Sequence, residues 1–344
     1  MFESLTKRAV NRETLDVLIG AAFGSDTGIA QSRELNEGFF NAAFRITLTD
    51  GREVVLKVSP TPDTALLTYE RDIMHGEAEF FRSAEAADVP LAAVLHTGFD
   101  RTAIDGDFIV MAAVDGVTWH SLEQRLDDEA KAALRRELGG IAARLHTVTH
   151  PTGRFGYPAV PELSGTTWPD AFLAMLAAVL KDSERYQVAM PLPPADLLKI
   201  ATRHTDALAE IHSPALVHFD LWPGNVMVTG FAPDGTARPD VAPSISGLID
   251  GERMIWGDPL MEFVGMDVFG RSDLDPDIAA GYLGAGGAID GGTDGERRLA
   301  LYHLYMQTLL LTEMGPRGYT DPGYLEFFSE QCPRRIVEAA DYLS

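Results

Sequence analysis

The sequence predicts an α+β fold in two parts, a β-rich N-terminal part and a mainly helical C-terminal part. Strand-like segments and a hairpin signal occupy residues 42–113, whereas helical periodicity dominates after residue 116. At 344 residues the chain is long enough for two hydrophobic cores. We therefore expect an N-terminal nucleotide-binding lobe over residues 1–113 and a helical lobe over residues 114–344, with the ligand site in the cleft between them.

The N-terminal part is expected to begin with a helix and to continue as a small, mostly antiparallel sheet. Asp50-Gly51 is a typical hairpin dipeptide, and it separates two segments that read as paired strands. The expected elements are helices at residues 12–23 and 69–87 and strands at residues 42–48, 53–58, 93–97 and 108–113.

The C-terminal part is expected to be a set of helices with a few short strands. Residues 128–146 place four apolar residues on one helical face, namely Leu134, Leu138, Ile141 and Leu145. Further helices are expected at residues 168–181, 194–212, 297–313 and 324–343, and strands at residues 215–217, 226–228 and 245–249.

The composition restricts the classes of partner. The chain has 51 acidic and 28 basic residues, a formal net charge of −23, which repels nucleic acid and anionic membranes. The same charge would favour a cationic acceptor, and the alternative explanation is solubility or a host whose proteins are acidic. The longest apolar run, residues 171–180, is too short to span a membrane. A single cysteine, Cys332, excludes an internal disulfide and favours a cytoplasmic location.

Two short segments carry the strongest chemical signal. The loop Val217-His218-Phe219-Asp220-Leu221-Trp222-Pro223-Gly224-Asn225 presents a carboxylate and an amide, and Leu248-Ile249-Asp250 ends an apolar strand with a second carboxylate. Phosphoryl transfer needs a carboxylate that orients the attacking hydroxyl and oxygen ligands that hold Mg²⁺ against the nucleotide phosphates. Asp220, Asn225 and Asp250 fit these tasks in that order.

Lys57 is the single lysine of an apolar strand at residues 54–58, so its ammonium group needs an anion nearby. A nucleotide phosphate and a helix carboxylate would supply one, with Glu77 as the first choice of partner and Glu70 as the second. The alternative is an edge position with the ammonium group in solvent. Gly38 lies in a loop that is either a phosphate-binding loop or an ordinary hairpin loop.

His218 and Asp258 are expected to support the site rather than to react. We expect the ring of His218 to hold the loop by hydrogen bonds, with a proton carrier or a metal ligand as the alternatives. Asp258-Pro259 is typical of a helix N-cap followed by proline at the first helical position, and we expect it to brace the loop. No G-x-S-x-G, G-x-G-x-x-G or G-x-x-x-x-G-K-[ST] motif occurs, which argues against a hydrolase elbow, a dinucleotide site and a Walker-type site.

With these residues in view, the chain resembles the aminoglycoside phosphotransferase family of small-molecule kinases from about residue 27 to residue 330. The resemblance is strongest at residues 216–226 and 248–259. It implies a protein-kinase-like bilobal fold, ATP or GTP as the phosphoryl donor, and Mg²⁺. By that likeness Asp220 is the catalytic base, and Asn225 and Asp250 hold the metal.

The resemblance also implies a nucleotide site in the N-terminal lobe. Lys57, paired with Glu77, would steady the phosphates, with Gly38 in the adjoining loop, and the backbone from Ala112 to Val114 would receive the base. The chain departs from the family pattern twice: Phe219 stands where the family usually has glycine, and Gly251 stands where it commonly has an aromatic residue.

The leading functional hypothesis is therefore a kinase for a hydroxyl group of a small molecule, for which a cationic antibiotic such as an aminoglycoside, choline, a sugar and homoserine are all candidates. The alternatives are a nucleotide-binding pseudokinase without turnover and a metal-dependent hydrolase built on His218, Asp220 and Asp250. The acceptor pocket is expected between residues 168–186 and 297–313. Four carboxylates either contact a cationic acceptor there or are merely solvated helix residues: Asp182, Glu184, Glu262 and Glu313.

Overall fold

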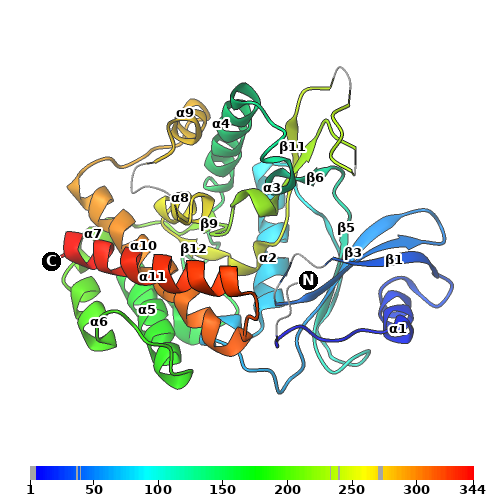
Figure 1. Cartoon of the computed structure of the whole chain (residues 1–344), viewed down its shortest axis with the longest axis horizontal. Helices are drawn as coiled ribbons and strands as arrows, with labels where there is room; N and C mark the ends of the chain where they lie inside the picture. Colours follow the sequence, from blue (N-terminus) through cyan, green and yellow to red (C-terminus); the bar gives the residue numbers. More distant parts are fainter. Residues whose placement is uncertain (1–4, 36–37, 39, 233, 239–240, 270–273) are drawn as a thin grey trace.

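A computed structural model describes residues 5–35, 38, 40–232, 234–238, 241–269 and 274–344. An antiparallel sheet forms the N-terminal part, and helices with two small sheets form the C-terminal part (Figure 1). The predicted α+β architecture is confirmed. The boundary between residues 113 and 114 stays a prediction.

The N-terminal sheet has five strands in the order β1-β2-β3-β5-β4, and every neighbouring pair is antiparallel. Its strands are β1 (Ile29–Leu35), β2 (Ala42–Leu48), β3 (Glu53–Val58), β4 (Val94–Gly98) and β5 (Phe108–Ala112). The hairpin signal predicts β2 and β3 with their observed bounds. Lys57 of the central strand β3 pairs with Ala43 of β2 and with Ile109 of β5.

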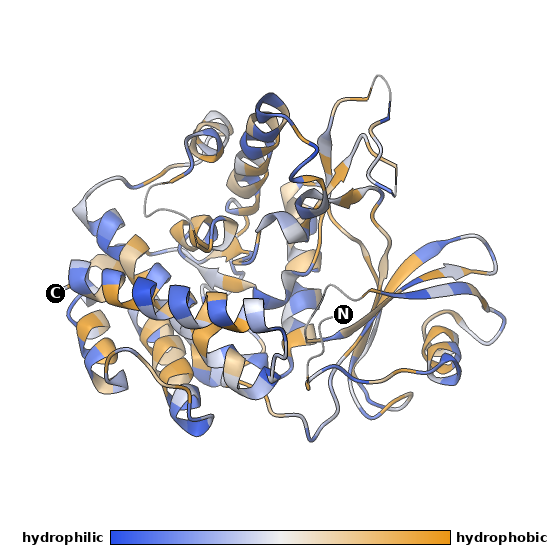
Figure 2. Cartoon of the chain, in the orientation of Figure 1, coloured by the Kyte–Doolittle hydropathy of each residue, from blue (hydrophilic) through white to orange (hydrophobic). Residues whose placement is uncertain are grey.

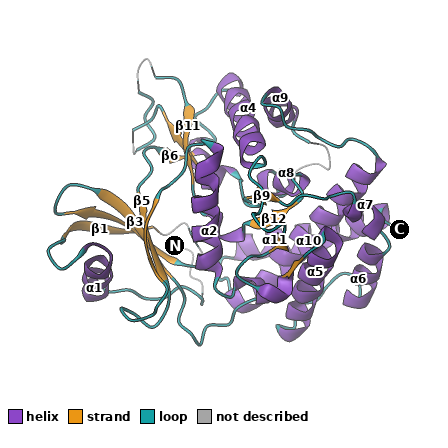
Figure 3. Ribbon diagram, turned by 180° about the vertical axis from the view of Figure 1, so that it is seen from behind, coloured by secondary structure: helices purple, strands orange, loops and turns teal. Residues whose placement is uncertain are grey.

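Helices cover both faces of this sheet, with α1 (Arg12–Phe23) and α2 (Ile73–Ala84) on opposite sides (Figures 1 and 3). Val54, Leu56 and Val58 share one hydrophobic cluster with the buried residues of α1. Because side chains alternate along a strand, Lys57 lies on the other face, toward α2. The strand pattern thus directs the lysine of β3 at the carboxylates of α2.

The helix expected at residues 69–87 is interrupted before α2 begins. A 3₁₀ turn, η1 (Thr68–Glu70), precedes the break, and a second, η2 (Glu85–Ala87), follows α2. Asp72 adopts a left-handed conformation with φ of 51°, which ends the first turn. The interruption leaves Tyr69 and Glu70 outside α2, where both are buried.

The helical part is organised around the long helix α10, on which α5, α8 and α11 pack, while α4 packs against α9 (Figure 1). Its helices are α3 (Trp119–Leu122), α4 (Asp128–Leu145), α5 (Trp168–Arg185), α6 (Pro194–Thr202), α7 (Thr205–Ala209), α8 (Leu260–Met266), α9 (Pro276–Gly284), α10 (Thr293–Arg317) and α11 (Pro322–Tyr342). The helix expected at residues 194–212 is divided into α6 and α7. Figure 2 shows hydrophilic residues along the outer side of α11 and apolar residues on the strands of the N-terminal sheet. Within the described ranges, no helix is both long enough and apolar enough to cross a membrane.

Two small sheets in the helical part position the segments around Asp220 and Asp250. One contains β6 (Val117–Thr118), β10 (Val226–Thr229) and β11 (Ser244–Leu248), and the other contains β7 (Phe155–Gly156), β8 (Ser164–Gly165), β9 (Ala215–Val217) and β12 (Ile255–Gly257). The loop at residues 218–225 runs from β9 in one sheet to β10 in the other. Asp250 follows β11 closely, so both segments are anchored in strands.

Candidate active site

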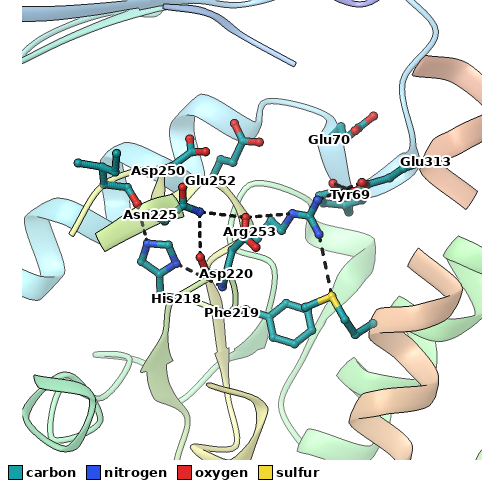
Figure 4. Close-up of polar contacts among 12 residues, drawn as sticks. Tyr69, Glu70, His218, Phe219, Asp220, Asn225, Asp250, Glu252, Arg253 and Glu313 are labelled. Atoms are coloured by element: carbon teal, nitrogen blue, oxygen red, sulfur yellow. Dashed lines mark hydrogen bonds and ion pairs between the residues drawn. The ribbon is translucent and has the colours of Figure 1, made fainter. Parts of the chain in front are cut away.

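The Asp220 carboxylate lies between an amide and a guanidinium group (Figure 4). Asn225 Nδ2 donates to the backbone oxygen of Asp220 at 2.8 Å and to its Oδ2 at 3.2 Å. On another side, Arg253 Nε is 3.6 Å from Oδ2, and the Asp220 side chain keeps 17% of its surface exposed. The carboxylate is therefore oriented by neighbours and still reachable.

A backbone hydrogen bond brings the second predicted segment beside the first. The N–H of Ile249 donates to the backbone oxygen of Asn225 at 3.0 Å, and Asp250 is the next residue. Asp250 adopts a left-handed conformation with φ of 64°, which turns the chain sharply after β11. The structure thus brings Asp220, Asn225 and Asp250 together.

His218 holds the two segments to each other. Its Nε2 is 3.0 Å from the backbone oxygen of Ile249, and its Nδ1 accepts from the N–H of Asp220 at 3.3 Å. Because Nδ1 accepts, the neutral ring carries its proton on Nε2, and this N–H donates a hydrogen bond to the backbone oxygen of Ile249. These contacts confirm the expected loop-holding role.

Glu262 of α8 holds the start of the loop. Its two carboxylate oxygens accept from the N–H groups of His218 at 2.8 Å and Phe219 at 2.9 Å, and its side chain is fully buried. Hydrogen bonds from N–H groups to a buried carboxylate are among the stronger ones in proteins. The flanking apolar residues of α8 were the sequence signal for this buried position.

The expectation for the four acceptor carboxylates was wrong for three of them. Glu262 holds backbone N–H groups, buried Asp182 accepts from the N–H of Thr68 at 2.6 Å, and buried Glu313 accepts from Tyr69 at 2.6 Å. Each carboxylate is engaged inside the protein, so it is neither solvated nor open to a ligand. Glu184 is exposed, as expected of a solvated helix residue.

Asp258 lies directly before Pro259, the N-cap residue of α8, and its Oδ1 accepts from the N–H of Leu260 at 3.0 Å. Its other oxygen accepts from Arg298 at 2.8 Å and from Tyr302 at 2.7 Å, both on α10. The prediction of Asp258 as the N-cap is therefore wrong by one residue, because Pro259 is the N-cap. The hydrogen bonds of the Asp258 side chain tie α8 to α10, and it is Glu262 that braces the loop.

Lys57 is paired, as expected, with Glu77. The distance from Lys57 Nζ to Glu77 Oε1 is 2.6 Å, and the ammonium group also contacts Asp250 Oδ1. The lysine side chain is 11% exposed, which contradicts the alternative of a solvated ammonium group. The second-choice partner, Glu70, is instead bonded to Arg317 at 2.7 Å.

The pKa values of this cluster follow from burial and from opposite charges. Burial lowers the pKa of Lys57, but Asp250 and Glu77 outweigh it and the net shift is upward. Burial raises the pKa of Asp250, but Lys57 outweighs it and the net shift is downward. Burial dominates at Glu77 and raises the pKa of that carboxyl despite Lys57. Lys57 and Asp250 therefore stay charged at neutral pH.

The two departures from the family pattern have structural explanations. Phe219 adopts φ of 64°, the conformation that favours glycine, and its buried ring stacks on Tyr305 at 5.9 Å between centroids. At Gly251, an added Cβ would lie 2.5 Å from the ring of Phe80, which packs edge-on against His218. The ring of Phe80, from α2, thus occupies the space beside residue 251.

The remaining predicted nucleotide residues lie in the strands of the N-terminal sheet or in the segments that adjoin them. Gly38 is exposed in the loop between β1 and β2, whereas Asn36, Glu37 and Phe39 lie outside the described residues. Ala112 ends β5, and its N–H donates to Ala93 at 2.8 Å. The backbone oxygen of Val114 is 3.5 Å from an Arg45 nitrogen. Their role in binding a nucleotide stays a prediction.

Arg253 is a site residue that the sequence did not single out. It belongs to the turn η5 (Gly251–Arg253), and its guanidinium group is buried. Burial raises the pKa of Asp220, and the charge of Arg253 is the largest effect in the opposite direction. The sequence signal for Arg253 was its position as a charged residue directly before the apolar run at residues 254–256.

Oxygen ligands suited to Mg²⁺ converge at one place. Carboxylate oxygens of Glu77, Asp250 and Glu252 lie within 4.8 Å of one another. The amide nitrogen of Asn225 donates to Asp220, which leaves the amide oxygen of Asn225 as a further candidate ligand for Mg²⁺. Mg²⁺ is usually held by one or two carboxylates together with phosphate oxygens and water, so these residues fit a Mg²⁺–nucleotide complex.

Comparisons with known proteins agree with this geometry. The model of the phosphotransferase enzyme family matches residues 32–302. No curated protein matches the chain. The solved structures that resemble it include a candidate fructosamine-3-kinase from Thermobifida fusca, with a TM-score of 0.63, 18% identity and coverage of 96% of this chain and 100% of that one.

Two aminoglycoside phosphotransferases also resemble the chain. APH(4)-Ia, in a ternary complex with AMP-PNP and hygromycin B, has a TM-score of 0.60 and 18% identity over 95% of this chain and 98% of that one. APH(2'')-IIa, in a ternary complex with streptomycin and ATP, has a TM-score of 0.57 and 17% identity over 97% and 99%. The fold is thus the protein-kinase-like fold of these enzymes. The chain belongs to the phosphotransferase enzyme family, and it is a kinase with an alcohol group as acceptor.

Proposed function

We propose that the protein is a Mg²⁺-dependent kinase that transfers the γ-phosphoryl group of ATP or GTP to a hydroxyl group of a small molecule. The observation that carries this proposal is the convergence of the Asp220 carboxylate, the Asn225 amide and the Lys57–Asp250 ion pair at the junction of the two parts. Phosphoryl transfer depends mainly on positioning and on electrostatic stabilisation. These residues supply both.

Asp220 is the proposed catalytic base. Asn225 and Arg253 fix its carboxylate from two sides, at 3.2 and 3.6 Å from Oδ2, and the partly exposed side chain can accept a hydrogen bond from an acceptor hydroxyl. The hydroxyl proton passes to the carboxylate while the hydroxyl oxygen bonds to the γ-phosphorus, and the bond from that phosphorus to the β–γ bridging oxygen breaks, which releases ADP or GDP. This role requires an ionised Asp220, which the nearby charge of Arg253 favours.

Lys57 and Asp250 are the proposed nucleotide clamp. Lys57 is held by Glu77 and offers its positive charge to the phosphates, while Asp250 and the amide oxygen of Asn225 are the proposed ligands of Mg²⁺. Bound Mg²⁺ would neutralise the charge that develops on the transferred group. Gly38 and the backbone at Ala112 and Val114 are proposed to contact the phosphates and the base.

The acceptor class is open between a cationic antibiotic and a metabolic alcohol. The similar structures include an enzyme bound to streptomycin, an enzyme bound to hygromycin B and a candidate fructosamine-3-kinase. Three of the four carboxylates expected to attract a cation are engaged inside the protein, which removes them as support for a cationic acceptor. We therefore propose a small hydroxylated acceptor and leave its charge to experiment.

An acceptor panel tests the proposal. Purified protein is incubated with Mg²⁺–ATP or Mg²⁺–GTP and with aminoglycosides, fructosamines, sugars, choline and homoserine, and products are analysed by mass spectrometry. We expect one acceptor class to gain a phosphoryl group with wild-type protein and none with Asp220→Asn. Nucleotide binding by both proteins without transfer to any acceptor would favour the pseudokinase alternative.

A further inference from the structure

Arg253 is held away from Asp220 by a second carboxylate. Its Nη2 donates to Glu313 Oε2 at 3.0 Å, whereas its Nε stays 3.6 Å from Asp220 Oδ2 (Figure 4). Among the described residues, the buried Nε has no hydrogen-bond partner. A buried N–H group without a partner is costly, so the surrounding contacts must hold it in this position.

Glu313 is built to hold this arginine. Its side chain, 3% exposed on α10, accepts from the Tyr69 hydroxyl at 2.6 Å and lies 3.2 Å from an Arg317 nitrogen. Arg317 in turn donates to Glu70 at 2.7 Å. Tyr69 and Glu70 come from the turn before α2, so this support joins the N-terminal part of the chain to α10.

A guanidinium group that is not restrained prefers to pair with a carboxylate through two parallel hydrogen bonds. Such a pair would occupy oxygen lone pairs of Asp220. In the observed arrangement the positive charge of Arg253 is near Asp220, yet no hydrogen bond from the arginine takes up the carboxylate. A base that must accept a substrate proton needs this combination.

We propose that Glu313, supported by the Tyr69 hydroxyl, is a positioning residue for phosphoryl transfer that keeps Arg253 near Asp220 but out of hydrogen-bonding contact with it. This inference rests on the proposed function of Asp220 as the base. Loss of the Glu313 charge releases Arg253, which then closes on Asp220 and competes with the acceptor hydroxyl. The loss therefore slows transfer without weakening the binding of nucleotide.

The kinetic test measures ADP formation from Mg²⁺–ATP by the full chain, with water as the acceptor. We expect Glu313→Gln to lower kcat by about tenfold or more and to leave KM for ATP within about twofold of wild type. In an Arg253→Met background, Glu313→Gln should cause no further loss, because the arginine that it controls is gone. If Glu313→Gln lowers kcat by the same factor in the Arg253→Met background as in wild type, the proposal is overturned. An unchanged kcat in Glu313→Gln would overturn it as well.

A milder pair of variants covers a failure of Glu313→Gln to fold. Tyr69→Phe removes one hydrogen bond to Glu313 and should lower kcat severalfold. Its control is Tyr342→Phe, which removes the hydrogen bond from an exposed tyrosine to Glu296, another carboxylate of α10, and should leave kcat unchanged. Equal effects of the two variants on kcat would contradict the positioning role.

A crystal structure of Glu313→Gln, or of Tyr69→Phe, tests the geometry without any activity. We expect Arg253 to move to hydrogen-bonding distance from Asp220, and an arginine left at its original distance would overturn the proposal. Asp220→Asn separates this result from the proposed function. If Asp220→Asn forms ADP as fast as wild type, Asp220 is not the base, whatever Glu313 does.

Discussion

At the scale of single residues, Phe219 combines a strained backbone with a well-packed ring. Its left-handed backbone, with φ of 64°, places the following residue, Asp220, between Asn225 and Arg253. A non-glycine residue in this conformation costs roughly 1–2 kcal/mol. The fully buried ring, stacked on Tyr305, offsets this cost.

Phe219→Gly should therefore destabilise the protein although it relieves strain. Removal of a buried phenylalanine ring costs about 3–5 kcal/mol, which exceeds the strain that is relieved. We expect the free energy of unfolding, measured by urea titration, to fall by about 2 kcal/mol. A more stable variant would show that the backbone strain dominates.

The pKa of Asp220 predicts how activity depends on pH. Burial raises this pKa above its ordinary value of 3.8, and the base acts only when it is ionised. Activity should therefore fall on acidification at a pH above 3.8. Arg253 opposes the shift, so Arg253→Met should move the acid limb of kcat/KM to higher pH. Movement of the acid limb of kcat/KM to lower pH in Arg253→Met would contradict the electrostatic pairing of Arg253 with Asp220.

At the scale of elements, the short helix α8 organises the 218–225 loop. Glu262 accepts the N–H groups of His218 and Phe219, and Gly265 lies so close to Phe219 that an added Cβ would be 2.5 Å from its backbone carbon. The helix and the loop therefore pack as one unit. Asp258, at the start of the same helix, fixes that unit to α10.

Glu262→Gln tests this unit. An amide offers one acceptor oxygen where the carboxylate offers two, so one buried N–H group loses its partner, and we expect a loss of about 2–3 kcal/mol in stability together with a lower kcat. Glu184→Gln is the control, since Glu184 is an exposed helix carboxylate. Its stability should stay within about 0.5 kcal/mol of wild type. Equal effects of the two variants on unfolding would contradict the role of α8.

The sequence predicts those structural features that are determined within a short segment of the chain. The bounds of β2 and β3 follow from a hairpin dipeptide, and Asp220, Asn225 and Asp250 lie in two contiguous segments. Partners of buried charges are not local: Arg253 meets Glu313 across 60 residues of sequence. Strands of two or three residues are too short for a periodic pattern, so β7, β8 and β12 were not predicted, although β9 was predicted with its observed bounds.

At the scale of the whole molecule, polar contacts across the junction tie the two parts together at the site. Besides the Lys57–Asp250 pair, Asn41 donates to Glu252 at 2.8 Å, Trp256 donates to Glu79 at 2.7 Å, and Arg317 donates to Glu70 at 2.7 Å. These buried or half-buried contacts are weakly screened by salt. The rest of the chain carries a large excess of acidic residues, whose mutual repulsion salt does screen.

The net charge of −23 predicts that salt stabilises the protein. Screening weakens the repulsion among excess surface carboxylates more than it weakens the buried ion pairs. We expect the melting temperature, measured by differential scanning calorimetry, to rise with NaCl by roughly 1–2 °C for each kcal/mol of repulsion removed. A falling melting temperature would mean that exposed ion pairs outweigh the net repulsion.

The most direct test of the central claim compares phosphoryl transfer by wild type and by Asp220→Asn at saturating Mg²⁺–ATP. A change from aspartate to asparagine keeps the size of the side chain and removes its basicity. We expect both proteins to bind Mg²⁺–ATP with the same Kd by calorimetry, and ADP formation by the variant to fall by about 100-fold or more. Equal rates of ADP formation at equal binding would contradict the assignment of Asp220 as the catalytic base.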